Sequence, residues 1–250
     1  MVSIVLLEES LEESIRLNKF LSDAGVCSRR AADRAIEEGQ VLVNNEVAVM
    51  GQRIYDSDSV TFYGKLVTRD NKKPVLIAYN KPAGIVCTAE KRERNNIIDH
   101  IGYPQRIYPI GRLDKDSTGL ILLTNQGDLV NKIMRAVNAH EKEYIVTTDK
   151  DITEDFITKM SQGVYLDELD ITTRKCKVKK LAKREFSIIL TQGLNRQIRR
   201  MCQTLGYRVR TLNRIRIMNI QLADLKIDTY RDVTDEEITE LNKMLEGSKN

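Results

Sequence analysis

The stretch Ile110-Gly-Arg-Leu-Asp-Lys-Asp-Ser-Thr-Gly-Leu-Ile-Leu-Leu-Thr124 joins a polar turn to a short apolar run. The run Leu120–Leu123 is typical of a buried β-strand, so the turn before it should lie where a strand enters the core. Asp114 stands in this turn, between Gly111 and Gly119. A carboxylate that leads directly into a core strand is unusual, and Asp114 is therefore a candidate for chemistry.

Three other interpretations of Asp114 stay open at this point. Aspartate is common in turns and helix caps, and it can also form a surface ion pair with Arg112. The segment Asp114-Lys-Asp-Ser-Thr118 matches the D-x-D-x-T pattern of phosphatases that form an aspartyl phosphate. Such a site needs further carboxylates for Mg²⁺, and no paired acidic motif follows Asp128 in a suitable loop, so Asp116 reads as a turn or capping group.

Composition and cysteine usage narrow the class of protein. The 250 residues, 41% hydrophobic and 30% charged, fit one large or two modest globular domains. No apolar run approaches about 20 residues, and the N-terminus lacks the basic start of a signal peptide, so we expect a cytoplasmic protein without membrane segments. Four scattered cysteines and two histidines argue against a metal site and against disulfides.

The charge distribution points to a polyanionic partner. The net charge is only +4, but seven arginines lie between Arg196 and Arg216, while acidic residues crowd the segment from Asp232 to Glu246. A basic patch of this kind suits nucleic acid. The alternative interpretation is a charged face that is simply solvated.

Residues 15–60 have the pattern of a small basic unit with two helices and a hairpin. Apolar residues at i, i+3, i+4 and i+7 predict a first helix, and Ser28 is placed to cap a second one. Arg30 and Arg34 lie one turn apart on that second helix. Asn44-Asn45 predicts the tight turn of a hairpin because Asn tolerates positive φ.

This segment resembles the S4 RNA-binding domain, an α-L module found in a ribosomal protein and in many RNA-modifying enzymes. The matching residues are Arg16-Leu-Asn-Lys-Phe-Leu21, Gly25, Ser28-Arg-Arg30, Ile36 and Gly39-Gln-Val-Leu-Val-Asn-Asn45. The resemblance implies RNA binding through Ser28, Arg29, Arg30 and the helix face around Arg34.

The chain changes character after this unit. Residues 63–73 are polar and charged and suggest a linker. Beyond them, short apolar strands alternate with tight turns and with helices, including an expected strand at 85–87 and a helix from about 195 to 205. This pattern predicts an α+β protein whose larger domain has a mixed, mostly antiparallel sheet flanked by helices. We expect an S4-like domain with its linker at 14–73 and a second domain at 74–250.

Two further stretches of the larger domain carry candidate functional residues. On the expected helix, Arg196, Arg199 and Arg200 share one face by their i, i+3, i+4 spacing, opposite an apolar face. Guanidinium groups on such a face suit phosphate contacts, and we expect Arg196 and Arg200 to contact RNA. Tyr144 lies in an expected strand, where an ordinary core tyrosine is the alternative interpretation.

Three ordered motifs and the S4-like segment resemble the pseudouridine synthases of the RsuA/RluB/RluE/RluF subgroup. The motifs are Gly111–Thr124, Lys142-Glu-Tyr144 and Gly193–Met201, together with Asn80-Lys-Pro-x-Gly84. The stretches 140–144 and 211–219 are most similar to the RluF type. The resemblance implies isomerisation of uridine to pseudouridine in RNA, without a cofactor and by a monomer.

The resemblance also assigns roles to residues. Asp114 corresponds to the essential aspartate, acting either as a nucleophile at the sugar or as the base of a glycal route. Arg199 would pair with Asp114 and stabilise its negative charge, and Tyr144 would stack on the uracil and assist proton transfer. Arg112 would hold open the neighbours of the target nucleotide, which has to be flipped out or single-stranded to be reached.

The RluF-like stretches suggest a uridine of 23S ribosomal RNA as the target, with the anticodon of tyrosine tRNA as a second candidate. The rival hypothesis is a non-catalytic S4-type RNA-binding or ribosome-assembly protein. Such a protein would keep the basic patches, but it has no need for Asp114, Tyr144 and Arg199 together.

Overall fold

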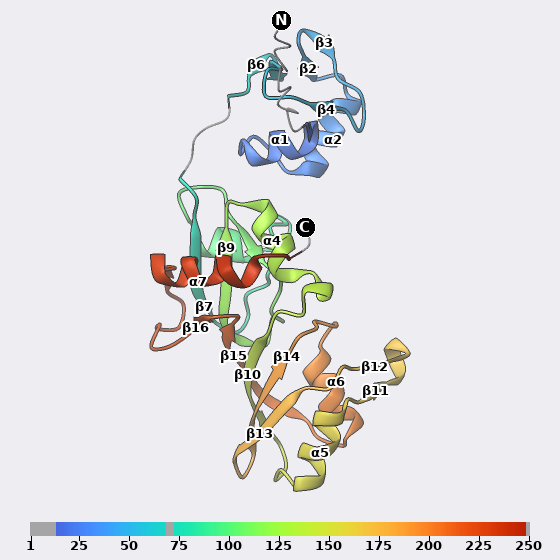
Figure 1. The fold of residues 1–250 in the computed structure, drawn as a ribbon, viewed down its shortest axis with the longest axis vertical. Coiled ribbons are helices and arrows are strands. Elements are labelled where there is room, and N and C mark those ends of the chain that lie inside the picture. The colour runs from blue at the N-terminus through green and yellow to red at the C-terminus, as the bar shows by residue number, and fades with distance from the viewer. Residues whose placement is uncertain (1–13, 69–72, 249–250) are drawn as a thin grey trace, which may run out of the picture. The chain divides into compact units, whose positions relative to one another are not determined.

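The computed structural model describes residues 14–68 and 73–248. The chain divides into two compact units, Met1–Lys73 and Pro74–Asn250, each of which is described by itself below (Figure 1). The α+β class expected from the sequence is confirmed. Within the described ranges, no helix is both long enough and apolar enough to cross a bilayer.

The first unit packs two short helices against a small sheet. Its elements are β1 (Ile15–Arg16), α1 (Leu17–Asp23), α2 (Arg29–Glu37), β2 (Val41–Val43), β3 (Glu46–Val47), β4 (Arg53–Ile54), β5 (Val60–Phe62) and β6 (Lys65–Leu66). Four strands form an antiparallel sheet in the order β3-β2-β5-β6, and β1 pairs with β4. A core of its own includes Leu17, Leu21, Ala32, Val41 and Ile54, all buried.

Local sequence signals set the boundaries of these elements. The Ser28 hydroxyl accepts a hydrogen bond from the backbone amide of Ala31 at 3.2 Å and so caps α2. Asn44 and Asn45 both have positive φ in the turn between β2 and β3, as expected. The linker expected at 63–73 is wrong in part, because Lys65–Leu66 pairs with β5 as β6; residues 69–72 lie outside the described ranges.

The second unit is built around one large sheet. Its strands are β7 (Leu76–Lys81), β8 (Tyr108–Ile110), β9 (Thr118–Thr124), β10 (Lys142–Thr148), β11 (Tyr165–Leu166), β12 (Ile171–Thr172), β13 (Lys177–Ala182), β14 (Glu185–Leu190), β15 (Val209–Ile217), β16 (Ile220–Gln221) and β17 (Tyr230–Asp232). Its α-helices are α3 (Ile97–Ile101), α4 (Gly127–Met134), α5 (Glu154–Gln162), α6 (Gln197–Thr204) and α7 (Asp235–Leu245). Two 3₁₀ turns lie at Ala136–Asn138 and Asp167–Leu169.

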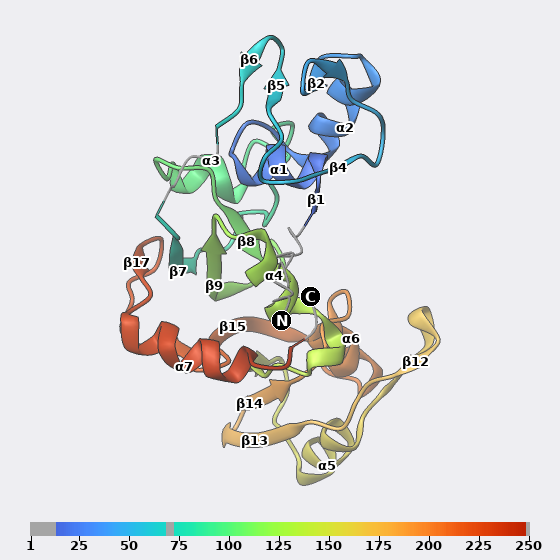
Figure 2. The same ribbon diagram turned by 45° about the horizontal axis from the view of Figure 1, so that its top comes forward.

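The strand order is β13-β14-β10-β15-β9-β7-β17. Outside this order, β16 pairs with β15 and β8 pairs with β9. Among these described strands, β9 and β15 form the one parallel pair. The expected mixed, mostly antiparallel sheet is therefore confirmed. The short hairpin β11–β12 projects from the body of this unit (Figure 2).

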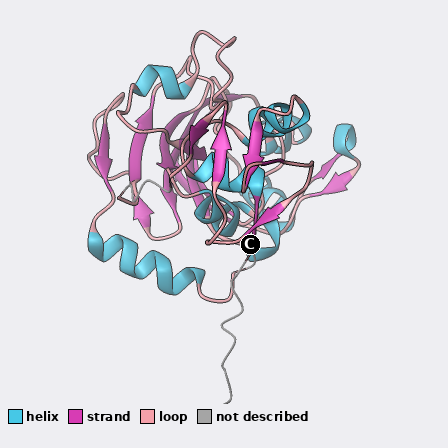
Figure 3. Ribbon diagram, turned by 90° about the horizontal axis from the view of Figure 1, so that it is seen from above, coloured by secondary structure: helices cyan, strands magenta, loops and turns pink. Residues whose placement is uncertain are grey.

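Helices cover both faces of the sheet, so its central strands are buried on both sides (Figure 3). Along β9, Ile121 and Leu123 enter the core that includes residues of α5 and α6, whereas Leu120 and Leu122 enter the core that includes residues of α4 and α7. Alternate side chains of a strand point to opposite faces. The continuous apolar run that marked β9 in the sequence reflects this double burial.

The expected strand at 85–87 is wrong. Val86 forms only an isolated bridge with Asn96, and its backbone amide donates to the carbonyl oxygen of Asn95 at 2.9 Å. The carbonyl oxygen of Ile85 accepts from the Lys81 side chain at 2.9 Å. These backbone groups are satisfied by loops and by one lysine, so the apolar side chains of the segment are buried without a sheet ladder.

Candidate active site

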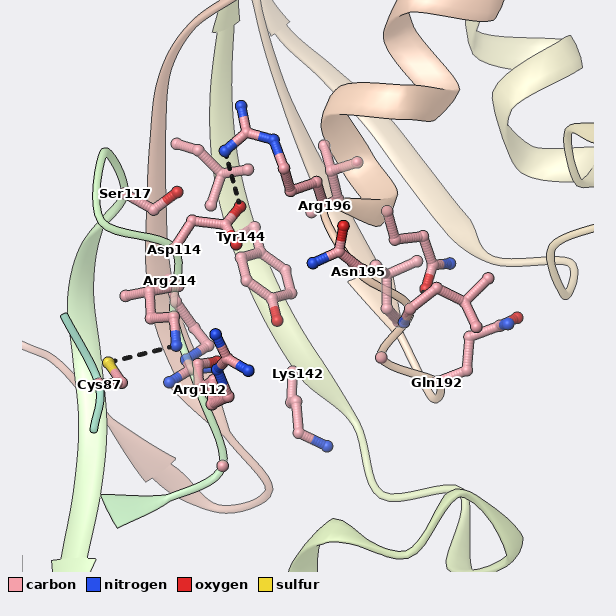
Figure 4. Close-up of a pocket in the computed structure, with 18 of the residues that line it drawn as sticks. Cys87, Arg112, Asp114, Ser117, Lys142, Tyr144, Gln192, Asn195, Arg196 and Arg214 are labelled. Atoms are coloured by element: carbon pink, nitrogen blue, oxygen red, sulfur yellow. Dashed lines mark hydrogen bonds and ion pairs between the residues drawn. The ribbon is translucent and has the colours of Figure 1, made fainter. Parts of the chain in front are cut away.

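A cavity of about 570 Å³ opens beside the Gly111–Gly119 turn. Its lining combines the turn itself, strands β10 and β15, and the segment that leads into α6. Figure 4 shows Asp114 and Ser117 on one side of this cavity and Gln192 and Asn195 on the other, with Tyr144 between them. Its volume lies in the range of small-molecule sites.

Lys81 ties the Asp114 turn to the end of β7. Its buried ammonium donates to three backbone carbonyl oxygens, those of Pro82 at 2.7 Å, Ile85 at 2.9 Å and Lys115 at 3.3 Å. Burial lowers the pKa of Lys81. Because the third carbonyl belongs to the residue that follows Asp114, the ammonium fixes the backbone from which the carboxylate projects.

Gly119 lets this turn approach β15 closely. Its φ is +103°, and a Cβ atom there would overlap the backbone of Arg214 and the side chain of Asn213. Arg214 is the residue with which Gly119 pairs in the parallel ladder of β9 and β15. Glycine is therefore required at this position, for its conformation and for the space it leaves.

The structure brings two of the three arginines around α6 to Asp114. Arg199 Nε and Arg196 Nη1 each lie 3.9 Å from Asp114 Oδ2, an ion-pair distance longer than a hydrogen bond. Arg199 Nη2 also donates to the Ser117 hydroxyl at 3.3 Å. Its Nε is buried, and among the described residues it has no hydrogen-bond partner. A movement of about 1 Å would turn these contacts into charge-assisted hydrogen bonds.

The helix expected from about residue 195 to 205 is present as α6, which begins at Gln197, two residues after the expected start. Arg196 is the residue before the helix and has a φ of +51°, the left-handed region that non-glycine residues rarely adopt. Strain of this kind clusters at functional sites. Here it accompanies an arginine that lies within 3.9 Å of both Asp114 and Asp116.

Arg200 does not join the cavity. It forms an ion pair with Glu168, and its Nε donates to the carbonyl oxygen of Asn195 at 3.0 Å. Arg112, by contrast, is exposed and lines the cavity (Figure 4). The i, i+3, i+4 spacing predicted that the three arginines share one face. In the structure, Arg196 and Arg199 lie near Asp114, whereas Arg200 pairs with Glu168.

Tyr144 lies on β10 in the middle of the sheet, paired with Ile188 on one side and with Arg214 on the other. It is half-buried, packs against the core and also lines the cavity. One side of Tyr144 therefore packs as a core tyrosine does, and the other side faces the cavity.

A β-bulge decides which arginine of β15 reaches the cavity. Glu143 pairs with Arg216, but the next residue, Tyr144, pairs with Arg214, which leaves Ile215 as an extra residue. Arg214 lines the cavity, whereas Arg216 bonds to Glu143 at 2.9 Å. Simple alternation would have placed both arginines on one face, and bulges often redirect side chains next to active sites.

Lys142 and Arg214 line the cavity, but no role was predicted for either residue from the sequence. Lys142 belongs to one of the three motifs, and its position two residues before Tyr144 places both on one face of a strand. Arg214 lies in the stretch 211–219 and among the seven arginines from Arg196 to Arg216, but nothing in the sequence singled it out, because the bulge cannot be read from the sequence. Within the described residues, no cluster of three His, Cys, Asp or Glu side chains is arranged to hold a metal ion, and none of the four cysteines in these residues forms a disulfide.

In the first unit, the residues expected to bind RNA are all exposed. Arg29, Arg30 and Arg34 lie on α2, and Ser28 directly precedes it. The Ser28 hydroxyl is already engaged as the helix cap. Ser28, Arg29 and Arg30 therefore share the N-terminal end of α2, where the helix dipole adds positive potential.

Comparisons with known proteins agree with this architecture. The family model described as RNA pseudouridylate synthase matches residues 75–204, and the S4 domain model matches residues 15–49. The dual-specificity RNA pseudouridine synthase RluF of Escherichia coli K12 is 54% identical over 238 residues, which are 95% of this chain and 81% of that protein. The ribosomal large subunit pseudouridine synthase B of Bacillus subtilis is 34% identical over 94% of this chain and 98% of that protein.

A solved pseudouridylate synthase structure is also similar, with a TM-score of 0.67 and 29% identity over 91% of this chain and all of that one. The chain belongs to the RNA pseudouridylate synthase family. It is an isomerase that converts uridine to pseudouridine in RNA, and it carries an RNA-binding S4 domain. The sequence-based prediction of its class is confirmed, and the rival hypothesis of a non-catalytic RNA-binding protein is not.

Proposed function

We propose that the cavity beside Asp114 is the active site and that the Asp114 carboxylate starts the reaction, as a nucleophile or as a base. The observation that carries this proposal is the convergence on one carboxylate of Arg196, Arg199 and the Lys81-anchored turn. A partly exposed carboxylate held by two guanidinium groups is positioned for chemistry without being locked in a short salt bridge.

In the proposed reaction, the target uridine is flipped into the cavity. The bond between C1′ and N1 breaks, the uracil turns and a bond forms between C1′ and C5. C5 then loses its proton while N1 gains one, so the product is an isomer of the substrate. Asp114 either attacks C1′, forming an ester that C5 of the uracil displaces, or removes a proton from C2′ and returns it when the new bond forms; both routes start from its carboxylate. Tyr144 stacks on the uracil, Arg199 holds Asp114, and Arg112 and Arg196 contact the flanking strand.

We infer that the target lies in 23S ribosomal RNA and that the anticodon of tyrosine tRNA is a second target. This inference is supported by relatives named as ribosomal large subunit and as dual-specificity synthases. Mapping of pseudouridine in ribosomal RNA and tRNA from cells with and without the protein tests it. An identical set of pseudouridines in both kinds of cell would contradict it.

Substitution at Asp114 tests the catalytic proposal. Asp114→Asn keeps the size of the side chain but removes the charge and the nucleophile, so we expect pseudouridine formation to fall by roughly 10³-fold or more. RNA affinity should be retained. The readout is single-turnover conversion of a ribosomal RNA fragment, detected by chemical mapping of pseudouridine.

Asp116→Asn is the matched control, since Asp116 is exposed and also lies 3.9 Å from Arg196. We expect it to retain most of the activity. Comparable losses in both variants would show that charge balance around Arg196, rather than the chemistry of Asp114, limits the reaction.

A further inference from the structure

Two cationic side chains in the cavity are buried and have no acidic partner. Lys142 keeps 7% of its surface exposed and Arg214 only 2%. The Lys142 ammonium donates to the carbonyl oxygen of His140 at 3.3 Å. Arg214 donates to the carbonyl oxygens of Leu120 at 2.7 Å and of Arg112 at 3.3 Å. Within residues 14–68 and 73–248, no carboxylate forms an ion pair with either cation.

The nearest acids in sequence serve another cation. Glu141 and Glu143 flank Lys142, but both accept hydrogen bonds from Arg216, at 3.0 Å and 2.9 Å. Because of the bulge in β15, Arg216 and Arg214 do not share one face of the strand. Glu141 and Glu143 pair with Arg216 and not with Arg214. Burial, together with the positive charge of Arg214, lowers the pKa of Lys142 to about 8.

Arg214 still has an unused donor. Its Nη2 is buried, and among the described residues it has no hydrogen-bond partner, although Nε and Nη1 are both bonded. An unpaired buried cation is costly, because it loses hydration without gaining a counter-charge. Both Lys142 and Arg214 line the cavity, so a ligand in the cavity can supply that counter-charge.

Lys142 and Arg214 are both neighbours of Tyr144 in the sheet. Arg214 is its direct cross-strand partner, and Lys142 stands two residues before it on β10, about 7 Å along the strand. In Figure 4 the ring of Tyr144 lies between Asp114 and Lys142. The Lys142–Arg214 pair is thus distinct from the Arg196–Arg199 pair, which contacts Asp114.

We propose that Lys142 and Arg214 form an anion subsite that binds the phosphate adjacent to the target uridine. This proposal rests on the proposed function, in which the cavity receives that uridine. A neutral uracil carbonyl would leave two buried positive charges uncompensated, whereas a phosphodiester carries the required charge and several acceptor oxygens. When Tyr144 stacks on the uracil, a phosphate of the same nucleotide can reach the cations that flank the ring.

Binding of mononucleotides to the full-length protein tests this subsite without catalysis. The dissociation constants of uridine, uridine 5′-monophosphate, uridine 3′-monophosphate and inorganic phosphate are measured by NMR titration at one fixed ionic strength. We expect one of the two monophosphates to bind at least about tenfold more tightly than uridine. We also expect it to bind more tightly than inorganic phosphate. Equal affinities for uridine and both monophosphates would overturn the proposal, and so would inorganic phosphate binding as tightly as the nucleotides.

Lys142→Met removes the ammonium but keeps the apolar stem, and it should abolish the advantage of the monophosphate while leaving uridine binding unchanged. Lys159→Met removes the same charge from the surface of α5 and should change neither affinity. Thermal unfolding measures whether each variant is folded. If a variant is not folded, the comparison of uridine, monophosphates and inorganic phosphate on the wild-type protein still tests the subsite. Equal weakening of uridine and monophosphate binding in Lys142→Met would contradict the subsite.

Pseudouridine formation is assayed separately, so the two proposals can fail independently. A Lys142-dependent monophosphate advantage in a protein whose activity survives Asp114→Asn would leave the anion subsite standing and overturn the role of Asp114. An inactive Asp114→Asn variant without any monophosphate advantage in the wild type would do the reverse. A fall in kcat for Lys142→Met with unchanged monophosphate binding would assign Lys142 to the chemistry instead and overturn the subsite.

Discussion

At the scale of single residues, the geometry of the cavity depends on Gly119, a position that has no side chain. Gly119 allows β9 to approach β15, and that approach brings the Asp114 turn to the residues of β15 that line the cavity. The position of Asp114 in a glycine-bounded turn could be predicted from the sequence. The use of Arg214 could not, because it follows from one extra residue, Ile215, in the ladder.

Gly119→Ala should destabilise the second unit strongly. Residue 119 has a φ of +103°, and the added Cβ would overlap the backbone of Arg214. We therefore expect a loss of roughly 2–4 kcal/mol in the free energy of unfolding. Urea unfolding followed by circular dichroism measures it. Gly84→Ala is the matched control, since Gly84 has a φ of +92° but no atom within 4 Å of the added Cβ. Equal losses would mean that backbone conformation alone, not the approach of β15, demands glycine.

At the scale of elements, boundaries with local chemical signals were predictable, and those set by distant contacts were not. Thr153 and Thr234 cap α5 and α7 through their hydroxyls, and threonine is one of the residue types preferred at helix N-caps. The segment 85–87 looked like a strand, but its backbone is bonded to Lys81 and to a loop. The start of α6 lies two residues after the expected one, because Arg196 adopts a left-handed conformation that no local pattern predicts.

Substitution of Ser28 separates the capping of α2 from RNA binding. Ser28→Ala removes the acceptor for the Ala31 amide and should cost about 1 kcal/mol of stability in the first unit. Ser28→Asp restores an acceptor and should recover that stability. Its negative charge beside Arg29 and Arg30 should nevertheless weaken RNA binding, as measured by fluorescence anisotropy. Unchanged RNA affinity in Ser28→Asp would place the RNA elsewhere on this unit.

At the scale of the whole molecule, the two units have separate cores. The residues of the first core all come from positions 15–67, whereas the two cores of the second unit draw on residues from 75 onward. This separation agrees with the compositional change that the sequence shows near residue 73. Each unit buries its own apolar residues, so each has the means to fold without the other.

Residues 74–250 alone should therefore keep their fold but bind RNA more weakly. We expect the arginines on α2 to contact RNA phosphates, so without them the dependence of log affinity on log salt should become less steep, by about 0.7–0.9 for each phosphate no longer neutralised. Circular dichroism checks the fold, and RNA titrations at several salt concentrations give the slope. An unchanged slope would show that the S4 domain neutralises no phosphates.

The parallel pairing of β9 with β15 also has a consequence during protein synthesis. It joins Gly119 to Arg214, which are 95 positions apart (119 to 214) in the chain. Closing so long a loop comes late in folding, after local hairpins have formed. A nascent chain that has not yet released residue 214 from the ribosome has Asp114 but neither β15 nor a closed cavity. With this cavity as the proposed active site, we expect catalytic activity only in a polypeptide whose central sheet is complete, and we expect truncated translation products to be inactive.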